Sequence, residues 1–364
     1  MKVAIVCDWL LGIGGSERVV LGLHEMFPNA PIYTSQYNRK DIPWFDDADV
    51  RTTWLQKLPP SLKKFLPLLR AYTFSRLDLS EYDLVISSSG AEAKGVKTGP
   101  KTTHICYCHS PTQYYWIRQD EYLKRPGFPL GFNWLARIGL KLLESPLKRW
   151  DKHAAKQPDY IITNSTYTQA NIKKYYNRDS VVIYPPVEVE RFRLRADAPS
   201  RHGLVVAGRQ TPYKRIDLAI EACNKLRVPL IVIGNGPDHR RLEKMAKRTI
   251  TFLTGVNDLN IVEHFQSSLA FIFPSADDFG IVAVEALAAG TPVIAYKKGG
   301  ALDYIKDGRN GVFFERQTIT NLAKAIELAL NKKFDYVQIS GSVEKFSPDR
   351  FKKEIKQYIN EMGS

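Results

Sequence analysis

Short runs of apolar, largely β-branched residues alternate with helix-like patterns along the whole chain of 364 residues. Apolar runs of this length are typical of strands in a parallel sheet whose two faces are covered by the intervening helices. The runs lie at 3–8, 31–35, 83–89, 103–109, 159–165, 181–187, 203–209, 229–236, 250–255, 269–275 and 291–296. The pattern therefore predicts an α/β fold with parallel sheets.

The series of strands stops once and starts again. Two prolines at 185–186 end the first series, and the polar segment 188–202 shows no periodicity. We therefore expect two Rossmann-like domains, 1–190 and 200–346, with an amphipathic helix at 347–364 completing the first. In such folds ligands bind beyond the carboxyl ends of the strands, so we expect the site in a cleft between two facing sheets.

A glycine-rich loop, GIGGSERVV at 12–20, follows the first predicted strand. Glycines between a strand and a helix let backbone N–H groups approach a phosphate, which makes Gly14 and Gly15 candidate phosphate contacts. A dinucleotide-binding loop would need glycine where Glu17 stands, and an acidic residue at the end of the next strand. The sequence has neither, so a dehydrogenase is disfavoured, and a tight turn without a ligand stays open as an alternative.

A second loop, GRQTPYKR at 208–215, follows the strand that opens the second series. Its Arg209 and Lys214 combine a planar fork with a point charge, a pair that suits a diphosphate. Such a pair would stabilise the charge on a leaving diphosphate without a metal ion. A solvated basic loop is the alternative interpretation.

A third loop, within 274–296, joins a strand to a helix that begins near Ile281. Backbone N–H groups of Phe279, Gly280 and Ile281 would face outward at the helix N-terminus, where anions bind. Asp277 and Glu285 flank this helix start, and their carboxylates are suited to accept hydrogen bonds from sugar and ribose hydroxyls.

The order and spacing of these three loops resemble the family-4 retaining glycosyltransferases of GT-B fold, over nearly the whole chain and more specifically in its second half. That family has a Glu, seven residues and a second Glu at the third loop, where this sequence has Asp277 and Glu285. The resemblance implies that Asp277 lies at the donor hexose and that Glu285 binds the ribose. Because the first acid is one methylene shorter than in the family, it would reach a hydroxyl through a backbone adjustment or a bridging water.

The same resemblance implies roles for the other candidates. Arg209 and Lys214 would hold the diphosphate, Phe279 to Ile281 would contact the phosphates and the sugar, and Gly14 and Gly15 would face the diphosphate from the other domain. The segments 233–237 and 254–260 match regions that line the base. The implied substrate-binding residues are therefore Gly14, Gly15, Gly236, Val256, Phe279, Gly280, Ile281 and Glu285.

His109, in YCHSP at the end of a strand, resembles the family histidine that contacts the donor sugar near the acceptor. With Arg209, Lys214 and Asp277 it completes the candidate catalytic set, and a purely structural histidine is the alternative. The segments NST at 164–166 and YPPV at 184–187, and especially DFGIVAVEA at 278–286 with GGALDYI at 299–305, are similar to mannosyltransferases of bacterial surface-polysaccharide assembly. This similarity implies GDP-mannose as the donor and a glycan or lipid-linked sugar as the acceptor.

Basic residues exceed acidic ones by 14, which favours anionic partners. Two stretches, 55–74 and 134–153, interleave cations with Leu, Phe and Trp, as expected for an anionic membrane surface; solvated helix faces are the alternative. The first stretch carries Lys57, Lys63, Lys64 and Arg70, and in the second Arg137, Lys141, Lys148 and Lys152 share one helical face. With no apolar run long enough to span a bilayer, we expect a cytoplasmic protein, peripheral on the inner face of the membrane.

Other classes of function stay as alternatives. The first is a UDP-sugar hexosyltransferase of the same fold, and the second is a basic nucleic-acid- or membrane-binding α/β protein without transferase activity. The chain shows no recognisable nucleic-acid module, so nucleic acid is not expected as a partner. A metal-dependent GT-A enzyme would need Asp-x-Asp after a strand, whereas Asp47 and Asp49 follow a polar segment. We therefore expect no cofactor and no metal site; the sequence leaves the oligomeric state open.

Overall fold

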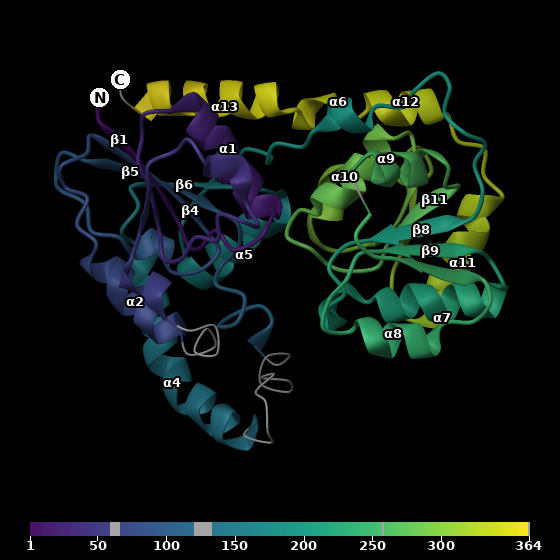
Figure 1. The fold of residues 1–364 in the computed structure, drawn as a ribbon, viewed down its shortest axis with the longest axis horizontal. Helices are drawn as coiled ribbons and strands as arrows, with labels where there is room; N and C mark the ends of the chain where they lie inside the picture. The colour runs from purple at the N-terminus through teal and green to yellow at the C-terminus, as the bar shows by residue number, and fades with distance from the viewer. Residues whose placement is uncertain (59–65, 120–132, 257, 363–364) are drawn as a thin grey trace. The chain divides into compact units, whose positions relative to one another are not determined.

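The computed structural model describes residues 1–58, 66–119, 133–256 and 258–362 (Figure 1). Contacts divide the chain into two compact units, Met1–Pro185 with Phe351–Ser364 and Pro186–Arg350. Among the described residues, every paired strand of either unit runs parallel to its neighbours. The prediction of two parallel-sheet α/β domains is therefore confirmed.

In the first unit, the described strands form one sheet in the order β3-β2-β1-β4-β5-β6-β7. Because β1 pairs in parallel with β4, their carboxyl ends lie side by side, and the loops after these strands meet at one edge. The strands are β1 (Val3–Cys7), β2 (Ile32–Thr34), β3 (Val50–Thr52), β4 (Leu84–Ser89), β5 (Thr103–Cys108), β6 (Tyr160–Thr163) and β7 (Val181–Val182). The longer helices are α1 (Gly15–Met26), α2 (Leu66–Arg76), α4 (Asn133–Ala154), α5 (Thr166–Tyr176) and α13 (Pro348–Met362).

The second unit repeats this arrangement with the strand order β10-β9-β8-β11-β12-β13. Here β8 and β11 are neighbours, so the loops that follow them lie at the same edge. The strands are β8 (Leu204–Ala207), β9 (Leu230–Ile233), β10 (Ile250–Leu253), β11 (Ala270–Phe273), β12 (Val293–Tyr296) and β13 (Gly311–Phe314). The helices are α6 (Val189–Phe192), α7 (Ile216–Leu226), α8 (His239–Met245), α9 (Asp258–Gln266), α10 (Ile281–Ala288), α11 (Ile319–Leu330) and α12 (Tyr336–Gly341).

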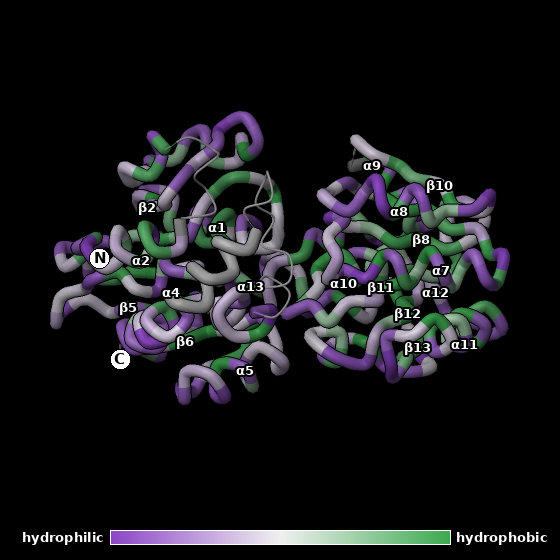
Figure 2. Tube along the Cα trace, turned by 90° about the horizontal axis from the view of Figure 1, so that it is seen from below, coloured by the Kyte–Doolittle hydropathy of each residue, from purple (hydrophilic) through white to green (hydrophobic). Residues whose placement is uncertain are grey.

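Each unit has its own apolar core between sheet and helices. In the second unit, side chains of β8, β9 and β11 pack with those of α7 and α11. In the first unit, β1, β4 and β5 pack with α1, and α13 adds Phe351 and Ile355 to the same core. Strands such as β6 and β8 carry the hydrophobic colour of Figure 2, as the continuous apolar runs require.

The segment between the two series of strands is not a bare linker. The sequence predicts residues 186–190 in the first domain and 191–199 in neither, whereas all of them fall in the second unit. The ring of Phe192 stacks on Phe265 at a centroid distance of 5.7 Å, and the backbone N–H of Leu194 donates to Ala288 in α10. Within 188–202 only Val189 and Phe192 are buried, so this stretch shows no hydrophobic periodicity.

Candidate functional site

Two neighbouring loops of the second unit bring a cation and an acid together. Lys214 ends a 3-10 turn (Pro212–Lys214) after β8, and Asp277 lies in the loop after β11. The Lys214 ammonium donates to Oδ2 of Asp277, and the two side chains are 21% and 11% exposed. Arg209, in the same loop as Lys214, is exposed. The predicted cation and the predicted acid thus form one ion pair at the carboxyl edge of the sheet.

Two adjacent glycines, Gly299 and Gly300, pack against the backbone at Asp277. The backbone N–H of Gly300 donates to the carbonyl of Asp277 at 2.9 Å. A Cβ added to Gly299 would lie 2.5 Å from that same carbonyl oxygen, and one added to Gly300 would lie 2.5 Å from the Cα of Phe279. The GGALD turn (Gly299–Asp303) therefore has to start with glycines, because larger residues would displace the loop that carries Asp277.

Tyr304 fixes the turn that begins α10. Its hydroxyl donates to the carbonyl of Phe279 at 2.9 Å and lies 3.3 Å from that of Gly280. Gly280 has φ of 91°, in the left-handed region, and α10 starts at Ile281 as the sequence predicts. Glu285 lies one turn further along α10 and is buried. The sequence does not predict this supporting role of Tyr304, because it depends on backbone carbonyls more than twenty residues away.

We predict that Gly280→Ala destabilises the second unit by about 2 to 4 kcal/mol, combining left-handed strain with overpacking. An added Cβ would lie 2.4 Å from the ring of Phe273 and 2.9 Å from the hydroxyl of Tyr304. Urea unfolding measures the change. Gly341→Ala is the matched control, because nothing lies within 4 Å of its added Cβ and its φ is not positive. Equal stability of the two variants would contradict the strain at Gly280.

The loops predicted to line a base are tied together by Gln210. Its side-chain amide donates to the carbonyl of Gly234 at 2.7 Å, and its side-chain oxygen lies 2.7 Å from Nδ1 of His239. A Cβ on Gly236 would come within 2.4 Å of the Gln210 carbonyl, so backbone packing requires glycine at this position. Val256 is half-buried in the loop after β10.

The glycine loop of the first unit meets a buried carboxyl group. Gly14 precedes α1 and Gly15 begins it. The Glu17 side chain is 6% exposed, and its Oε2 would lie 2.8 Å from a Cβ on Gly14. Burial raises the pKa of Glu17, while hydrogen bonds from its own backbone N–H and from Ser16 oppose the shift. A carboxyl group therefore occupies the helix N-terminus where the sequence predicts phosphate contacts by Gly14 and Gly15.

His109 follows β5 and is half-buried. Its Nε2 lies 2.7 Å from the hydroxyl of Ser88, and its carbonyl accepts a hydrogen bond from the side-chain amide of Asn164 at 2.9 Å. Burial lowers the pKa of His109 to about 4, so the imidazole is neutral at pH 7. His109 is thus suited to hydrogen bonding rather than to carrying positive charge.

Acid should destabilise the first unit through its buried histidines. His104 is wholly buried against Ser87, and burial lowers the pKa of His104 from 6.5 to about 3. The imidazole of His104 therefore takes up a proton near pH 6.5 in the unfolded chain, whereas it stays neutral at this pH in the folded chain. The contribution of neutral His104 to the free energy of unfolding is fully present above pH 6.5 and is lost as the pH falls towards 3. We expect His104→Gln to reduce the loss between pH 7 and pH 5 by about 2 kcal/mol, as measured by urea unfolding.

The exposed His153 provides the control for this measurement. His153→Gln is the matched variant, because it removes an exposed imidazole rather than a buried one. An identical slope in His104→Gln and wild type would contradict the burial of a neutral His104. His109 acts in the same direction and remains in both variants.

Buried polar side chains support the loop after His109. Asp151 of α4 pairs with the Lys94 ammonium at 2.7 Å and also accepts hydrogen bonds from Thr112, Trp116 and Tyr176. Asp151 is fully buried and Lys94 nearly so. No sequence pattern predicts this cluster, because its five members come from four separate segments with no shared spacing.

A second carboxylate, Asp8, organises the loop after β4. It accepts hydrogen bonds from the backbone N–H groups of Gly90, Ala91 and Ala93 at 2.7 to 3.0 Å. Arg70 of α2 contacts the same loop. Its guanidinium pairs with Glu92 at 2.7 Å and lies over the ring of Trp9. The site residues thus form two groups, each built within one unit.

Two family models match this chain. Residues 13–191 match "Glycosyltransferase Family 4", and residues 199–346 match "Glycosyl transferases group 1". Together the two models cover most of both units.

Curated relatives carry related names. The human "Alpha-1,3/1,6-mannosyltransferase ALG2" is 26% identical over 299 residues, which is 71% of this chain and 68% of that protein. An uncharacterized glycosyltransferase of Methanocaldococcus jannaschii is 30% identical over 187 residues, 50% of this chain and 52% of that protein. Streptomyces scabiei "D-inositol 3-phosphate glycosyltransferase" is 31% identical over 42% of each chain. The chain thus spans about half the length, or less, of the latter two relatives.

Solved structures share the fold. Anabaena HepE in complex with UDP matches with a TM-score of 0.72 at 17% identity, covering 99% of this chain and 100% of that one. The lipopolysaccharide outer core galactosyltransferase WaaB matches with a TM-score of 0.70 at 18% identity, covering both chains completely. At these identities the likeness establishes the two-domain fold alone.

Proposed function

We propose that this chain, a glycosyltransferase with a Glycosyltransferase Family 4 domain followed by a Glycosyl transferases group 1 domain, transfers a hexose to a sugar hydroxyl with retention of configuration. The observation that supports this most directly is the ion pair of Lys214 and Asp277 on adjacent loops at the carboxyl edge of a parallel sheet. Sugar nucleotides need both kinds of group, a cation for the diphosphate and an acceptor for the sugar hydroxyls.

In the proposed reaction, Arg209 and Lys214 stabilise the negative charge that develops on the leaving diphosphate. The bond from the anomeric carbon to the phosphate oxygen breaks, and its electron pair stays on the phosphate. The acceptor oxygen bonds to the same face of the sugar, and the departing phosphate takes the acceptor proton. Asp277 and Glu285 accept hydrogen bonds from hexose and ribose hydroxyls, and neutral His109 hydrogen-bonds the sugar.

We propose GDP-mannose as the donor. The support is the similarity of the GGALDYI segment to mannosyltransferases, together with the name of the human relative. UDP-sugars form the second candidate class, because the matched Anabaena structure is a complex with UDP.

A thermal-shift panel of GDP, UDP, ADP and their sugars tests the donor. A nucleotide at about 100 times its Kd should add about 2.7 kcal/mol to the stability of the unit that binds it. Stabilisation by GDP and GDP-mannose alone supports the proposal, and stabilisation by UDP compounds alone replaces the donor. If no nucleotide stabilises the protein, the proposed transferase function is wrong.

We also propose that transfer needs no metal ion, since Arg209 and Lys214 supply the positive charge at the diphosphate. Activity in excess EDTA should equal the activity in buffer. Strict dependence on an added divalent ion would contradict this part of the proposal.

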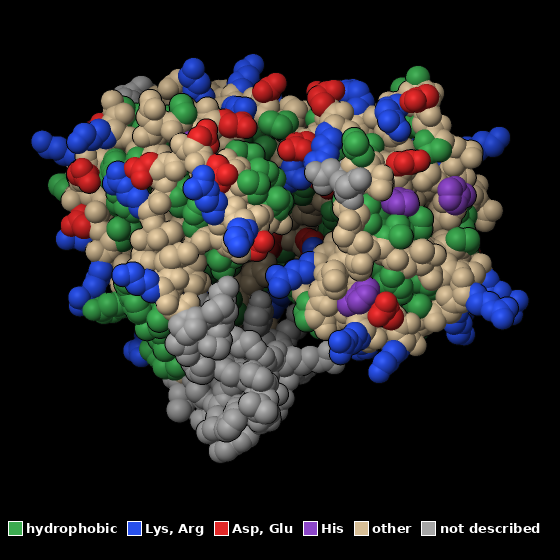
Figure 3. Space-filling model, in the orientation of Figure 1, with side chains coloured by type: hydrophobic (Ala, Val, Ile, Leu, Met, Phe, Trp, Pro, Cys, Tyr) green, Lys and Arg blue, Asp and Glu red, His purple; other side chains and the backbone are tan. Residues whose placement is uncertain are grey.

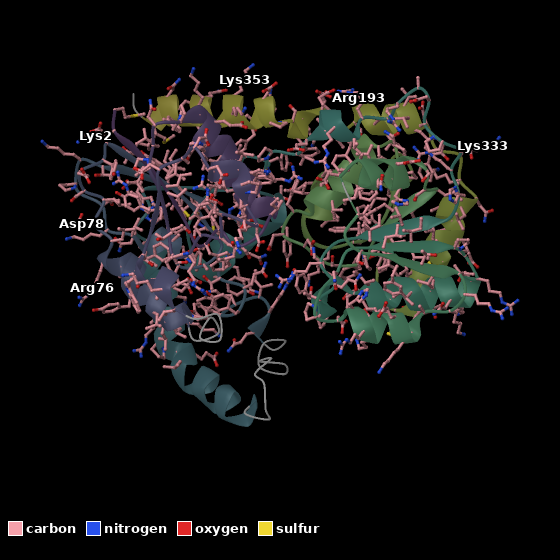
Figure 4. All side chains as sticks on the ribbon, in the orientation of Figure 1. Lys2, Arg76, Asp78, Arg193, Lys333 and Lys353 are labelled. Atoms are coloured by element: carbon pink, nitrogen blue, oxygen red, sulfur yellow. The ribbon has the colours of Figure 1, made fainter. Side chains whose placement is uncertain are left out.

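For the acceptor, we propose a glycan or lipid-linked sugar at an anionic membrane surface on the cytoplasmic side. Within 50–76 there is no acidic residue, and exposed Trp54, Leu68 and Tyr72 lie on or beside α2. Figure 3 shows hydrophobic side chains gathered over α2, and Arg76 points outward from the end of this helix in Figure 4. Aromatic and basic side chains together suit the headgroup region of an anionic bilayer. No helix within the described parts of the chain is long and apolar enough to cross a membrane.

The structure revises which cations can contribute to this surface. Arg70 is buried against Glu92 and is not available to a membrane. Lys148 pairs with Glu144, whereas Lys57 and Lys152 are exposed. Lys63 and Lys64 lie outside the described residues, and the side chains of Arg137 and Lys141 are likewise not described.

Vesicle sedimentation tests the surface. The double variant Leu68→Ser/Tyr72→Ser should bind phosphatidylglycerol vesicles less than wild type, and neither protein should bind phosphatidylcholine vesicles. The control is Leu328→Ser/Val337→Ser, which alters two exposed apolar side chains of the second unit. Equal binding of both variants and wild type would contradict the assignment to α2.

A further inference from the structure

We infer that Asp277 competes with the diphosphate for Lys214, so that the site binds the intact sugar nucleotide more tightly than the nucleoside diphosphate product. This inference rests on the proposed function and concerns how that same site releases its product. It starts from the ion pair, which joins the two groups that the sequence analysis had assigned to different parts of one ligand.

The acid of this pair is fixed in place, whereas the lysine can move. The carbonyl of Asp277 accepts a hydrogen bond from Gly300, and its backbone N and O lie 3.1 and 2.5 Å from where a Cβ on Gly299 would be. The Asp277 carboxylate is only one methylene away from this packed backbone. Lys214 carries its ammonium on a flexible four-carbon stem, so it can turn towards a phosphate while Asp277 stays in position.

The charges then decide between the two ligands. A diphosphate held by Lys214 brings negative charge close to the Asp277 carboxylate, and this juxtaposition is unfavourable in a largely buried site. An attached hexose adds hydroxyl donors that hydrogen-bond the same carboxylate and offset the unfavourable charge. Once the hexose has been transferred, that compensation is gone, and Asp277 regains Lys214.

Removing the negative charge of Asp277 separates its effect on GDP binding from its effect on GDP-mannose binding. In Asp277→Asn we expect GDP to bind at least about fivefold more tightly than to wild type, because the like charge is removed. We expect GDP-mannose to bind more weakly, because an amide replaces a charged acceptor of the hexose hydroxyls. The ratio of the two affinities should therefore reverse. Isothermal titration without acceptor measures both constants, with UDP and UDP-glucose used instead if the panel selects uridine.

Asp217→Asn is the control, since Asp217 belongs to another ion pair in the same segment, with Arg215 at 3.3 Å. It should leave both affinities unchanged. If Asp277→Asn does not fold, Asp277→Ser removes the same charge and is titrated in the same way. Unchanged or weaker GDP binding in the charge-free variant would overturn the inference, even with wild type binding both ligands. Absence of all nucleotide binding in wild type would instead overturn the proposed function.

Discussion

Lys214→Ala should lower turnover about 10²- to 10³-fold, the cost of removing one preorganised donor to a developing negative charge. Lys214 is the proposed diphosphate cation that the structure pairs with Asp277, so its removal takes away both the positive charge and the partner of that carboxylate. Initial rates with saturating donor measure the loss. The Michaelis constant for the donor should change less than turnover, because the charge on the phosphate increases as the sugar leaves.

Folding has to be separated from this loss of turnover. Lys214→Ala leaves the Asp277 carboxylate without its cation, and the second unit should lose some stability. The double variant Lys214→Ala/Asp277→Asn should regain that stability without regaining turnover. Lys297→Ala removes an exposed lysine that pairs with Glu315 in the same unit, and it should change neither property. Near-normal turnover of Lys214→Ala would contradict the role of this residue.

Asp151→Asn should destabilise the first unit by about 3 to 5 kcal/mol, the range measured when one partner of a buried ion pair is removed. The amide has nearly the same shape, but it leaves the buried Lys94 ammonium without a counter-charge. It also cannot accept from all four donors that converge on the carboxylate. Urea unfolding, followed by hydrogen exchange on β4 and β5 to identify the unit, measures the change.

An exposed ion pair in the same unit offers the matched control. Asp179 pairs with Lys173 at 2.8 Å on the surface, and Asp179→Asn should leave stability unchanged because water solvates both charges. Adding Lys94→Met to Asp151→Asn should restore part of the lost stability, since it removes the uncompensated charge. Equal stability of Asp151→Asn and Asp179→Asn would mean that the buried cluster contributes nothing.

Much of the fold follows from local patterns. The apolar runs at 203–209 and 269–275 became β8 and β11, because a strand buried on both faces has to be apolar at every position. The edge strands β3 and β13 were missed. Strand β3 reads Val-Arg-Thr and pairs with one neighbour only, so its side chains need not be apolar.

The candidate site likewise contains residues that a local pattern predicts and residues that only tertiary contacts explain. Gly280 was identified by its place before a helix, and its positive φ explains why glycine stands there. The supporting roles of Gln210, Glu17 and Tyr304 were not predicted. Gln210 and Tyr304 bond to backbone carbonyls of other loops, and Glu17 fills the space beside Gly14, contacts that only tertiary packing creates. The roles assigned to the site residues remain predictions until the nucleotide and variant measurements are made.

The sequence by itself determined two parallel α/β domains and the loops that carry the charged residues, and its resemblance to a known family indicated the class of function. Each of these depends on the order of residues along a short segment, where strand, turn and helix patterns are local. The tertiary structure decided that Lys214 meets Asp277, that Arg70 is buried and that Asp151 joins four segments through its hydrogen bonds. These pairs are far apart in sequence, and only the packing of strands and helices brings them within hydrogen-bonding distance.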